Sequence, residues 1–235
     1  MNKPTDEESL SCGHRKRLRQ KFLAGQLAEY EILELLLTYA IPRCDVRPLS
    51  RLLYKKYGNI HHLLSAPIDV LMKNNGIKEN TVVLLKLIHH ITELEYKQTL
   101  DSAPIFYNQE KLENYCRLVV GGKPIEEFHV LYLDAQFKLI EDQLHSSGTV
   151  DWTAVYVREI VKTSLDLNAR NIVLLHNHPT PYTTFSSQDI EITNELEKAL
   201  VGLSIGLYDH LLVSGDVVYS ARNMHLLDTD IKKVL

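Results

Sequence analysis

Two histidines and an aspartate stand close together in one short stretch of the chain. His176 and His178 follow the apolar run 172–175, which predicts a short buried strand whose alternate side chains leave the sheet on the same side. Ser186 precedes Asp189 by three residues, a spacing that echoes a capping box and predicts Asp189 in the first turn of a helix. Two imidazoles and a carboxylate would then converge as the ligands of a catalytic zinc site, with the fourth position left to water.

Each part of this pattern also has an ordinary structural explanation. Histidines at alternate positions are often polar residues at the end of a strand, and Ser-x-x-Asp is often only a helix cap. The His-Glu-x-x-His of metalloproteases and the His-x-Glu with Pro-Cys-x-x-Cys of nucleobase deaminases are absent from the sequence. A serine hydrolase is not expected either, so a metal site is the chemistry that the sequence favours.

The spacing of the whole stretch resembles the signature of the JAMM metalloenzymes, also called the MPN or JAB family. His-x-His-Pro, six residues, Ser, two residues and Asp occur here as His176, His178, Pro179, Ser186 and Asp189. The resemblance implies that the two histidines and the aspartate bind Zn2+. It also implies that the hydroxyl of Ser186 stabilises the tetrahedral oxyanion beside the metal.

The general base has to be chosen among several acidic residues. Within the JAMM enzymes the chain resembles RadC proteins, which carry a Glu two residues before a Phe, and Glu126 with Phe128 matches that position. Glu127 would point to the opposite face of the strand. The resemblance therefore implies Glu126 as the base, with Glu127 and Glu159 as the alternatives. RadC proteins usually have Ser-Gly after the motif proline, whereas this chain continues Thr180-Pro181-Tyr182, a bulkier loop beside the metal.

The N-terminal part of the chain also resembles RadC proteins. Gly13-His14-Arg15, the acidic and apolar run 29–37, and Ile41-Pro42-Arg43 carry this resemblance. The corresponding region of RadC proteins is similar to helix-hairpin-helix DNA-binding domains, whose hairpin usually reads Gly-Ile-Gly. This chain has Gly76-Ile77-Lys78, so the second glycine is missing, and a positive φ at Lys78 would be strained.

A basic cluster lies in the same region. Five Arg and Lys residues occur between His14 and Lys21, and such a run either forms a solvated helix face or contacts phosphates. Residues 1–100 hold 15 Lys and Arg against 11 Asp and Glu, whereas residues 101–235 hold 11 against 19. DNA is therefore the partner to test for the basic N-terminal helix.

Composition limits the class of protein. The chain has 235 residues, of which 45% are hydrophobic and 24% charged, which is enough for a buried core and predicts two modest domains. No apolar run approaches the length that a bilayer needs, and the start lacks a signal-peptide core. The three cysteines form no CxxC pair and suit reduced thiols, so we expect a cytoplasmic protein without a membrane partner.

The periodicity of apolar residues places these motifs on elements. Residues 1–100 show helical spacing, with Ile32, Leu35, Leu36 and Tyr39 on one face of the clearest helix. Further on, strands at 128–133, 138–140, 172–175, 211–213 and 217–219 are expected among helices at 109–120, 156–169 and from 186 onward. This is an α/β fold. The expected domains are an all-α helix-hairpin-helix-like domain at 1–100 and an MPN/JAB-like zinc domain at 104–227, with a mixed sheet and flanking helices.

Two functions of different classes follow. The first is a RadC-like protein whose C-terminal domain is a zinc-dependent peptidase or isopeptidase of JAMM type, acting on a protein or peptide and associated with DNA repair. The alternative is a DNA-binding repair or recombination protein whose zinc domain is a non-catalytic binding module. The intact ligand set and Glu126 favour the enzyme, and the basic cluster favours the binding protein.

Overall fold

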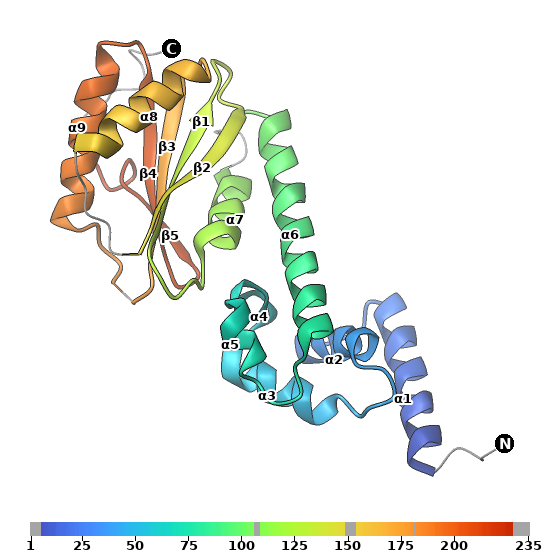
Figure 1. Ribbon diagram of the computed structural model, residues 1–235. Coiled ribbons are helices and arrows are strands. Elements are labelled where there is room, and N and C mark those ends of the chain that lie inside the picture. Colours follow the sequence, from blue (N-terminus) through green and yellow to red (C-terminus); the bar gives the residue numbers. More distant parts are fainter. Residues whose placement is uncertain (1–5, 106–108, 149–153, 181, 228–235) are drawn as a thin grey trace. The chain divides into compact units, whose positions relative to one another are not determined.

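The chain folds into two compact units, Met1–His90 and Ile91–Leu235 (Figure 1). The computed structural model describes residues 6–105, 109–148, 154–180 and 182–227. Within these residues the first unit is helical and the second combines a five-stranded sheet with helices. The expected fold class, a mixed sheet with flanking helices after a helical N-terminal region, is confirmed. None of the described helices is both long and apolar enough to cross a membrane.

The N-terminal unit is helical, and residues between Leu33 and Leu85 form its apolar core. Its helices are α1 (Asp6–Leu23), α2 (Glu29–Ala40), α3 (Arg47–Tyr57), α4 (Ile60–Ser65), α5 (Ile68–Met72) and the first half of α6 (Glu79–Ser102). Because α6 continues through the boundary between the units, the limits expected for the two domains, 1–100 and 104–227, stay a prediction. The turn before α6 takes a positive φ at Gly76 but not at Lys78, so the missing second glycine causes no backbone strain.

The buried face of α2 differs from the one expected. Of the expected face, Leu35 is buried and Leu36 packs against the core, whereas Ile32 and Tyr39 are 38% and 65% exposed. Leu33 and Leu37 enter the core in their place. The expectation was therefore wrong for Ile32 and Tyr39, because this helix is apolar on most of its circumference and spacing alone does not select one face.

The C-terminal unit is built around a mixed sheet with the strand order β2-β1-β3-β4-β5. Its strands are β1 (Glu127–Leu133), β2 (Leu139–Ser147), β3 (Asn171–His178), β4 (Gly206–Ser214) and β5 (Val217–Ser220). β3 and β4 are parallel, and the other neighbours are antiparallel. β3 lies in the centre of the sheet and is buried along nearly its whole length, which explains its continuous apolar run.

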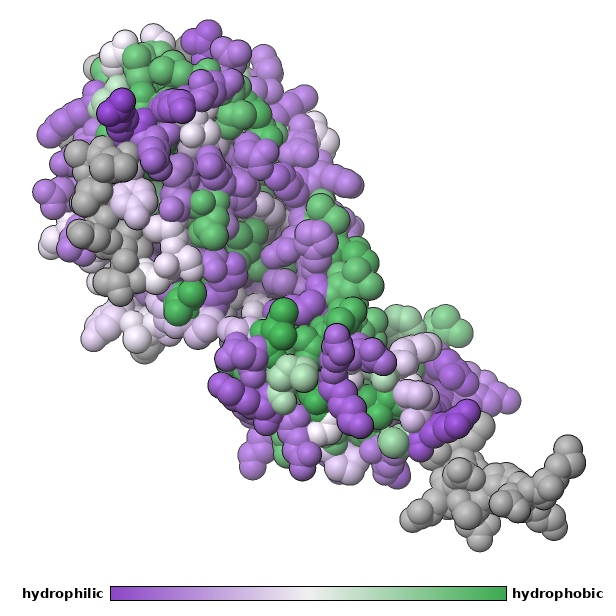
Figure 2. Space-filling model, viewed as in Figure 1, coloured by the Kyte–Doolittle hydropathy of each residue, from purple (hydrophilic) through white to green (hydrophobic). Residues whose placement is uncertain are grey.

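Helices cover both faces of this sheet (Figure 1). α7 (Gln109–Val120) packs on the face that carries Val173 and Leu175, while α8 (Ala154–Asp166) and α9 (Ser187–Val201) pack on the face that carries Ile172 and Leu174. Hydrophilic residues dominate much of the surface of this unit in Figure 2, as expected when the apolar side chains of the sheet are buried. Even-numbered residues of β3 therefore face α9.

Candidate metal centre

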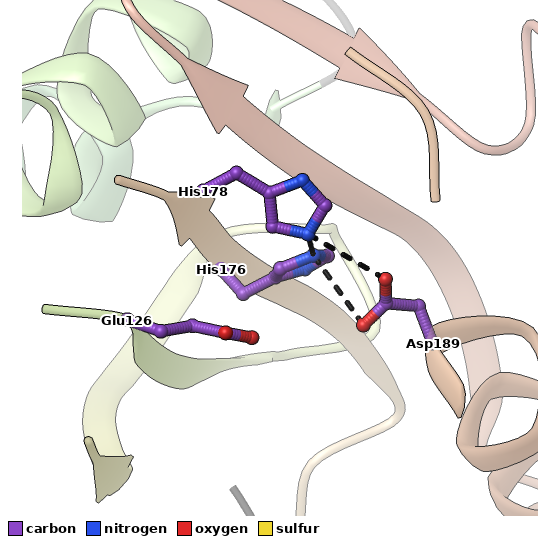
Figure 3. A group of neighbouring side chains, drawn as sticks. All are labelled: Glu126, His176, His178 and Asp189. Carbon is purple, nitrogen blue, oxygen red and sulfur yellow. Dashed lines mark hydrogen bonds and ion pairs between the residues drawn. The ribbon is translucent and has the colours of Figure 1, made fainter. Parts of the chain in front are cut away.

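Strand alternation brings both motif histidines to the α9 side of the sheet. His176 and His178 occupy the last even-numbered positions of β3, and Asp189 lies in the first turn of α9. Glu126 immediately precedes β1, the antiparallel neighbour of β3. Ligand atoms of these four residues all lie within 4.8 Å of one another, and Figure 3 shows their side chains converging on one small space. The structure thus brings together the three predicted ligands and the predicted base.

The distances between the nitrogen and oxygen atoms fit a small cation better than direct hydrogen bonds. Nε2 of His176 lies 3.3 Å from Nε2 of His178 and 3.5 Å from Oδ1 of Asp189, and Nε2 of His178 lies 3.7 Å from Oδ2. The two nitrogen–oxygen separations are long for hydrogen bonds. A tetrahedral zinc ion with bonds of about 2.0–2.1 Å separates its ligand atoms by about 3.3–3.4 Å. The donor set therefore fits zinc.

Both imidazoles are held through their other nitrogen. Nδ1 of His178 lies 3.1 Å from the carbonyl oxygen of Tyr182, and Nδ1 of His176 lies 2.9 Å from Nε2 of His210. A carbonyl only accepts, so Nδ1 of His178 carries the proton and a neutral ring keeps the Nε2 lone pair toward the site. The unusual loop after Pro179 thus still orients a ligand through the backbone of Tyr182.

Asp189 is fixed by the start of its own helix. Its Oδ2 accepts a hydrogen bond of 2.6 Å from the amide of Ser186, and its own amide donates to Oγ of Ser186 at 3.1 Å. Burial would raise the pKa of the Asp189 carboxyl, but the nearby imidazoles of His176 and His178, together with the contact to Ser186, outweigh it and hold the pKa far below its usual range. The carboxylate is therefore charged and ready for a cation.

Ser186 forms the N-cap of α9, as the spacing predicts. The cap uses the hydroxyl oxygen as an acceptor. Since a hydroxyl also carries one proton to donate, the cap does not occupy the donor that an oxyanion would need. The helix cap and oxyanion binding therefore do not compete for the same part of this group.

Glu126 and Glu127 face different surroundings. Burial raises the pKa of the Glu126 carboxyl, and the nearby charge of Asp189 adds to the effect. Glu127 contacts Lys123 and His129, whose hydrogen bonds outweigh burial and lower its pKa. Glu126 belongs to the converging group and Glu127 does not. Glu159, the other alternative, is an exposed residue of α8 outside this group.

Asn177, between the two histidines, faces the other way and holds the segment that carries Glu126. Its Oδ1 accepts from the amide of Glu127 at 2.8 Å, and its Nδ2 donates to the carbonyls of Ile125 at 3.1 Å and Lys123 at 3.5 Å. Asn177 is also almost completely buried. Asn177 therefore hydrogen-bonds the backbone on both sides of Glu126 and holds this segment next to β3.

Three residues near the site escaped the sequence reasoning. His210 of β4, Thr193 of α9 and Phe185 lie around His176, and the Phe185 ring centre is 5.9 Å from that of His176 and 5.1 Å from that of His210. The available signal was weak, because alternation along β4 shows that His210 and Leu212 share a face but not which face it is.

A serine-hydrolase pattern, Gly-x-Ser-x-Gly, also occurs at 202–206. In hydrolases with that motif the serine lies on a turn from a strand into a helix. Here the run leads from α9 into β4, and Ser204 is exposed. The order of the elements is reversed, so this run does not form a nucleophile elbow.

Comparison with known proteins finds one matching family model and relatives that are similar over most of the chain. The family model described as "RadC-like JAB domain" matches residues 106–226. The UPF0758 protein FN0909 of Fusobacterium nucleatum is 38% identical over 218 residues, which cover 88% of this chain and 94% of that relative. The UPF0758 protein SPO0054 of Ruegeria pomeroyi is 37% identical over 212 residues, 89% of this chain and 95% of the relative.

The role of Asn177 leads to a stability prediction. Asn177→Asp keeps an oxygen for the amide of Glu127 but places a carboxylate against the carbonyls of Ile125 and Lys123, which lose their donor. The free energy of unfolding should fall by about 1–3 kcal/mol, the cost of a buried polar group without a partner. Urea denaturation measures it, with the exposed Asn75→Asp as the matched control. Equal stability of the two variants would show that Asn177 does not hold this segment.

Proposed function

Because the chain belongs to the RadC-like JAB-domain family, and the wider JAB/MPN domain family includes hydrolases, we propose that its C-terminal unit is a zinc-dependent peptidase or isopeptidase of JAMM type. The observation that carries this proposal is the convergence of two imidazoles and two carboxylates within 4.8 Å. His176, His178 and Asp189 would hold the zinc ion. Glu126, on a separate segment of chain, would remain for proton transfer.

The chemistry divides between the metal and the protein. A zinc ion held by His176, His178 and Asp189 would lower the pKa of a coordinated water to about 7 and would polarise a substrate carbonyl. Glu126 takes the proton of the attacking water and passes it to the leaving amine, which is the work of a general base followed by a general acid. The partial burial that raises its pKa favours this exchange near neutral pH.

Ser186 and the surrounding segments complete the proposed machinery. The helix cap uses only the oxygen of the Ser186 hydroxyl as an acceptor, so the hydroxyl would be able to donate its proton to the oxyanion of the tetrahedral intermediate. Asn177 holds the Glu126 segment against β3, so base and ligands keep a fixed separation. The substrate class that fits these groups is a peptide or isopeptide bond of a protein.

Two neighbouring glutamates provide a matched test of this mechanism. Glu126→Gln should keep the bound zinc and lower hydrolysis about a hundredfold or more, the scale of a positioned base. Glu127→Gln, on the other side of the strand, should keep most of the rate. Peptide and isopeptide substrates are screened with the wild type, and zinc content is measured for each variant. A Glu126→Gln protein with its zinc and full rate would rule out Glu126 as the base. Metal binding without hydrolysis of any substrate would support the alternative, a zinc-binding module without catalysis.

We further propose that α1 contacts the phosphates of DNA, because Lys16, Arg17 and Arg19 are exposed on it. Arg15 is excluded from this set. Its guanidinium donates to the carbonyl of Cys44 at 2.6 Å and that of Ile41 at 3.5 Å, so it holds the segment after α2. An association with DNA repair would follow from such binding.

Salt dependence tests the contact with DNA. The variant Lys16→Ala/Arg17→Ala/Arg19→Ala should bind duplex DNA more weakly. The slope of log affinity against log salt should also flatten by about 2–3, because a protein that contacts fewer phosphates releases fewer counterions from the DNA. The control Arg158→Ala/Lys162→Ala/Lys198→Ala removes three exposed charges from the other unit and should leave the slope unchanged. The same slope in both variants would identify the cluster as a solvated helix face.

A further inference from the structure

His210 is a fully buried histidine next to a proposed zinc ligand. Its Nε2 lies 2.9 Å from Nδ1 of His176, and its Nδ1 lies 2.7 Å from Oγ1 of Thr193. Thr193 is one turn after Asp189 on α9, and its hydroxyl donates to the carbonyl oxygen of Asp189. An unbroken series of hydrogen bonds therefore runs from the backbone carbonyl of Asp189 on α9, through Thr193 and His210, to the imidazole of His176 on β3.

The direction of each hydrogen bond follows from its last acceptor. The carbonyl of Asp189 only accepts, so the single hydroxyl proton of Thr193 points toward it. Oγ1 of Thr193 must then accept from His210, which places the proton of His210 on Nδ1. A fully buried imidazole with no carboxylate at either nitrogen is neutral, so its Nε2 carries a lone pair.

That lone pair decides the state of His176. Nδ1 of His176 must donate to it, and the neutral ring of His176 then keeps its own lone pair on Nε2, the nitrogen that faces His178 and Asp189. Phe185 packs near both rings and shields this contact from water. The alternative tautomer of His176 would aim a proton at the metal position.

We propose that Thr193 and His210 are positioning residues that set the tautomer of His176 and so prepare the site for zinc. This inference rests on the proposed metal site. It adds that the affinity for zinc depends on a threonine hydroxyl that touches no metal. Without this hydroxyl nothing keeps the His210 proton on Nδ1, and a proton on Nε2 of His210 would force His176 to carry its own proton on Nε2.

Zinc affinity measured by competition with a chelator tests this dependence. Thr193→Val removes the hydroxyl at nearly constant volume and should weaken zinc binding about 10–100-fold, the usual cost of losing a partner behind a metal-ligating histidine. Thr193→Ser restores the hydroxyl and should bind like the wild type. Thr99→Val is the matched control, because the Thr99 hydroxyl also donates to helix carbonyls, those of Tyr96 and Glu95, on a helix remote from the histidines of the site. Equal affinity of Thr193→Val and wild type would overturn the proposal.

A second measurement separates this inference from the proposed function. Nitrogen-15 NMR of labelled histidines in the metal-free protein at mildly alkaline pH reports the tautomers directly. His176 and His210 should both carry the proton on Nδ1 in the wild type and lose that preference in Thr193→Val. A wild type with His176 protonated on Nε2 would overturn the inference even if zinc binds. A wild type with the expected tautomers but no zinc binding would confirm that Thr193 and His210 set the tautomer of His176, and would overturn the zinc site.

Discussion

In β3 every second side chain faces α9, and His176 and His178 take the last two of these positions. The strand is fixed on both sides, by β1 and by β4, so its register determines where both imidazoles emerge. A shift by one residue would exchange the histidines for Asn177 and send them to the face covered by α7. The antiparallel pairing with β1 brings Glu126 alongside, and the connection from β3 through α9 brings Asp189. Everything proposed for the site depends on this register.

Burial makes the polar groups around the site dependent on one another. Asp189 and His176 are almost completely shielded from water, and an isolated charge or an unpaired donor there would be costly. Local hydrogen bonds offset this cost. The amide of Ser186 donates to one carboxylate oxygen of Asp189, and Nδ1 of His176 and Nδ1 of His178 contact His210 and the carbonyl of Tyr182. What remains directed inward is a set of lone pairs. This electron-rich arrangement is stabilised most directly by a cation.

The sequence predicted the parts of the site that local pattern determines. The apolar run before His176, the alternation to His178 and the cap at Ser186 are short-range signals, and each has its expected place in the fold. The partners that meet only through the tertiary structure were not predictable in this way. His210 comes from a different strand, and the contact of Arg15 with the carbonyl of Cys44 removes it from the set of exposed cations. The buried face of α2 was predicted only in part, with Ile32 and Tyr39 exposed, because that helix is apolar on more than one side.

The most direct test of the account is the metal content of the purified protein, measured together with that of one double variant. We expect about one zinc ion per chain in the wild type, held by His176, His178 and Asp189 with the fourth tetrahedral position left to water, and almost none in His176→Ala/His178→Ala. A matched variant, His61→Ala/His62→Ala, removes two histidines from the N-terminal unit and should keep the zinc of the wild type. Full zinc occupancy in His176→Ala/His178→Ala, or a wild type that binds no zinc, would contradict the account.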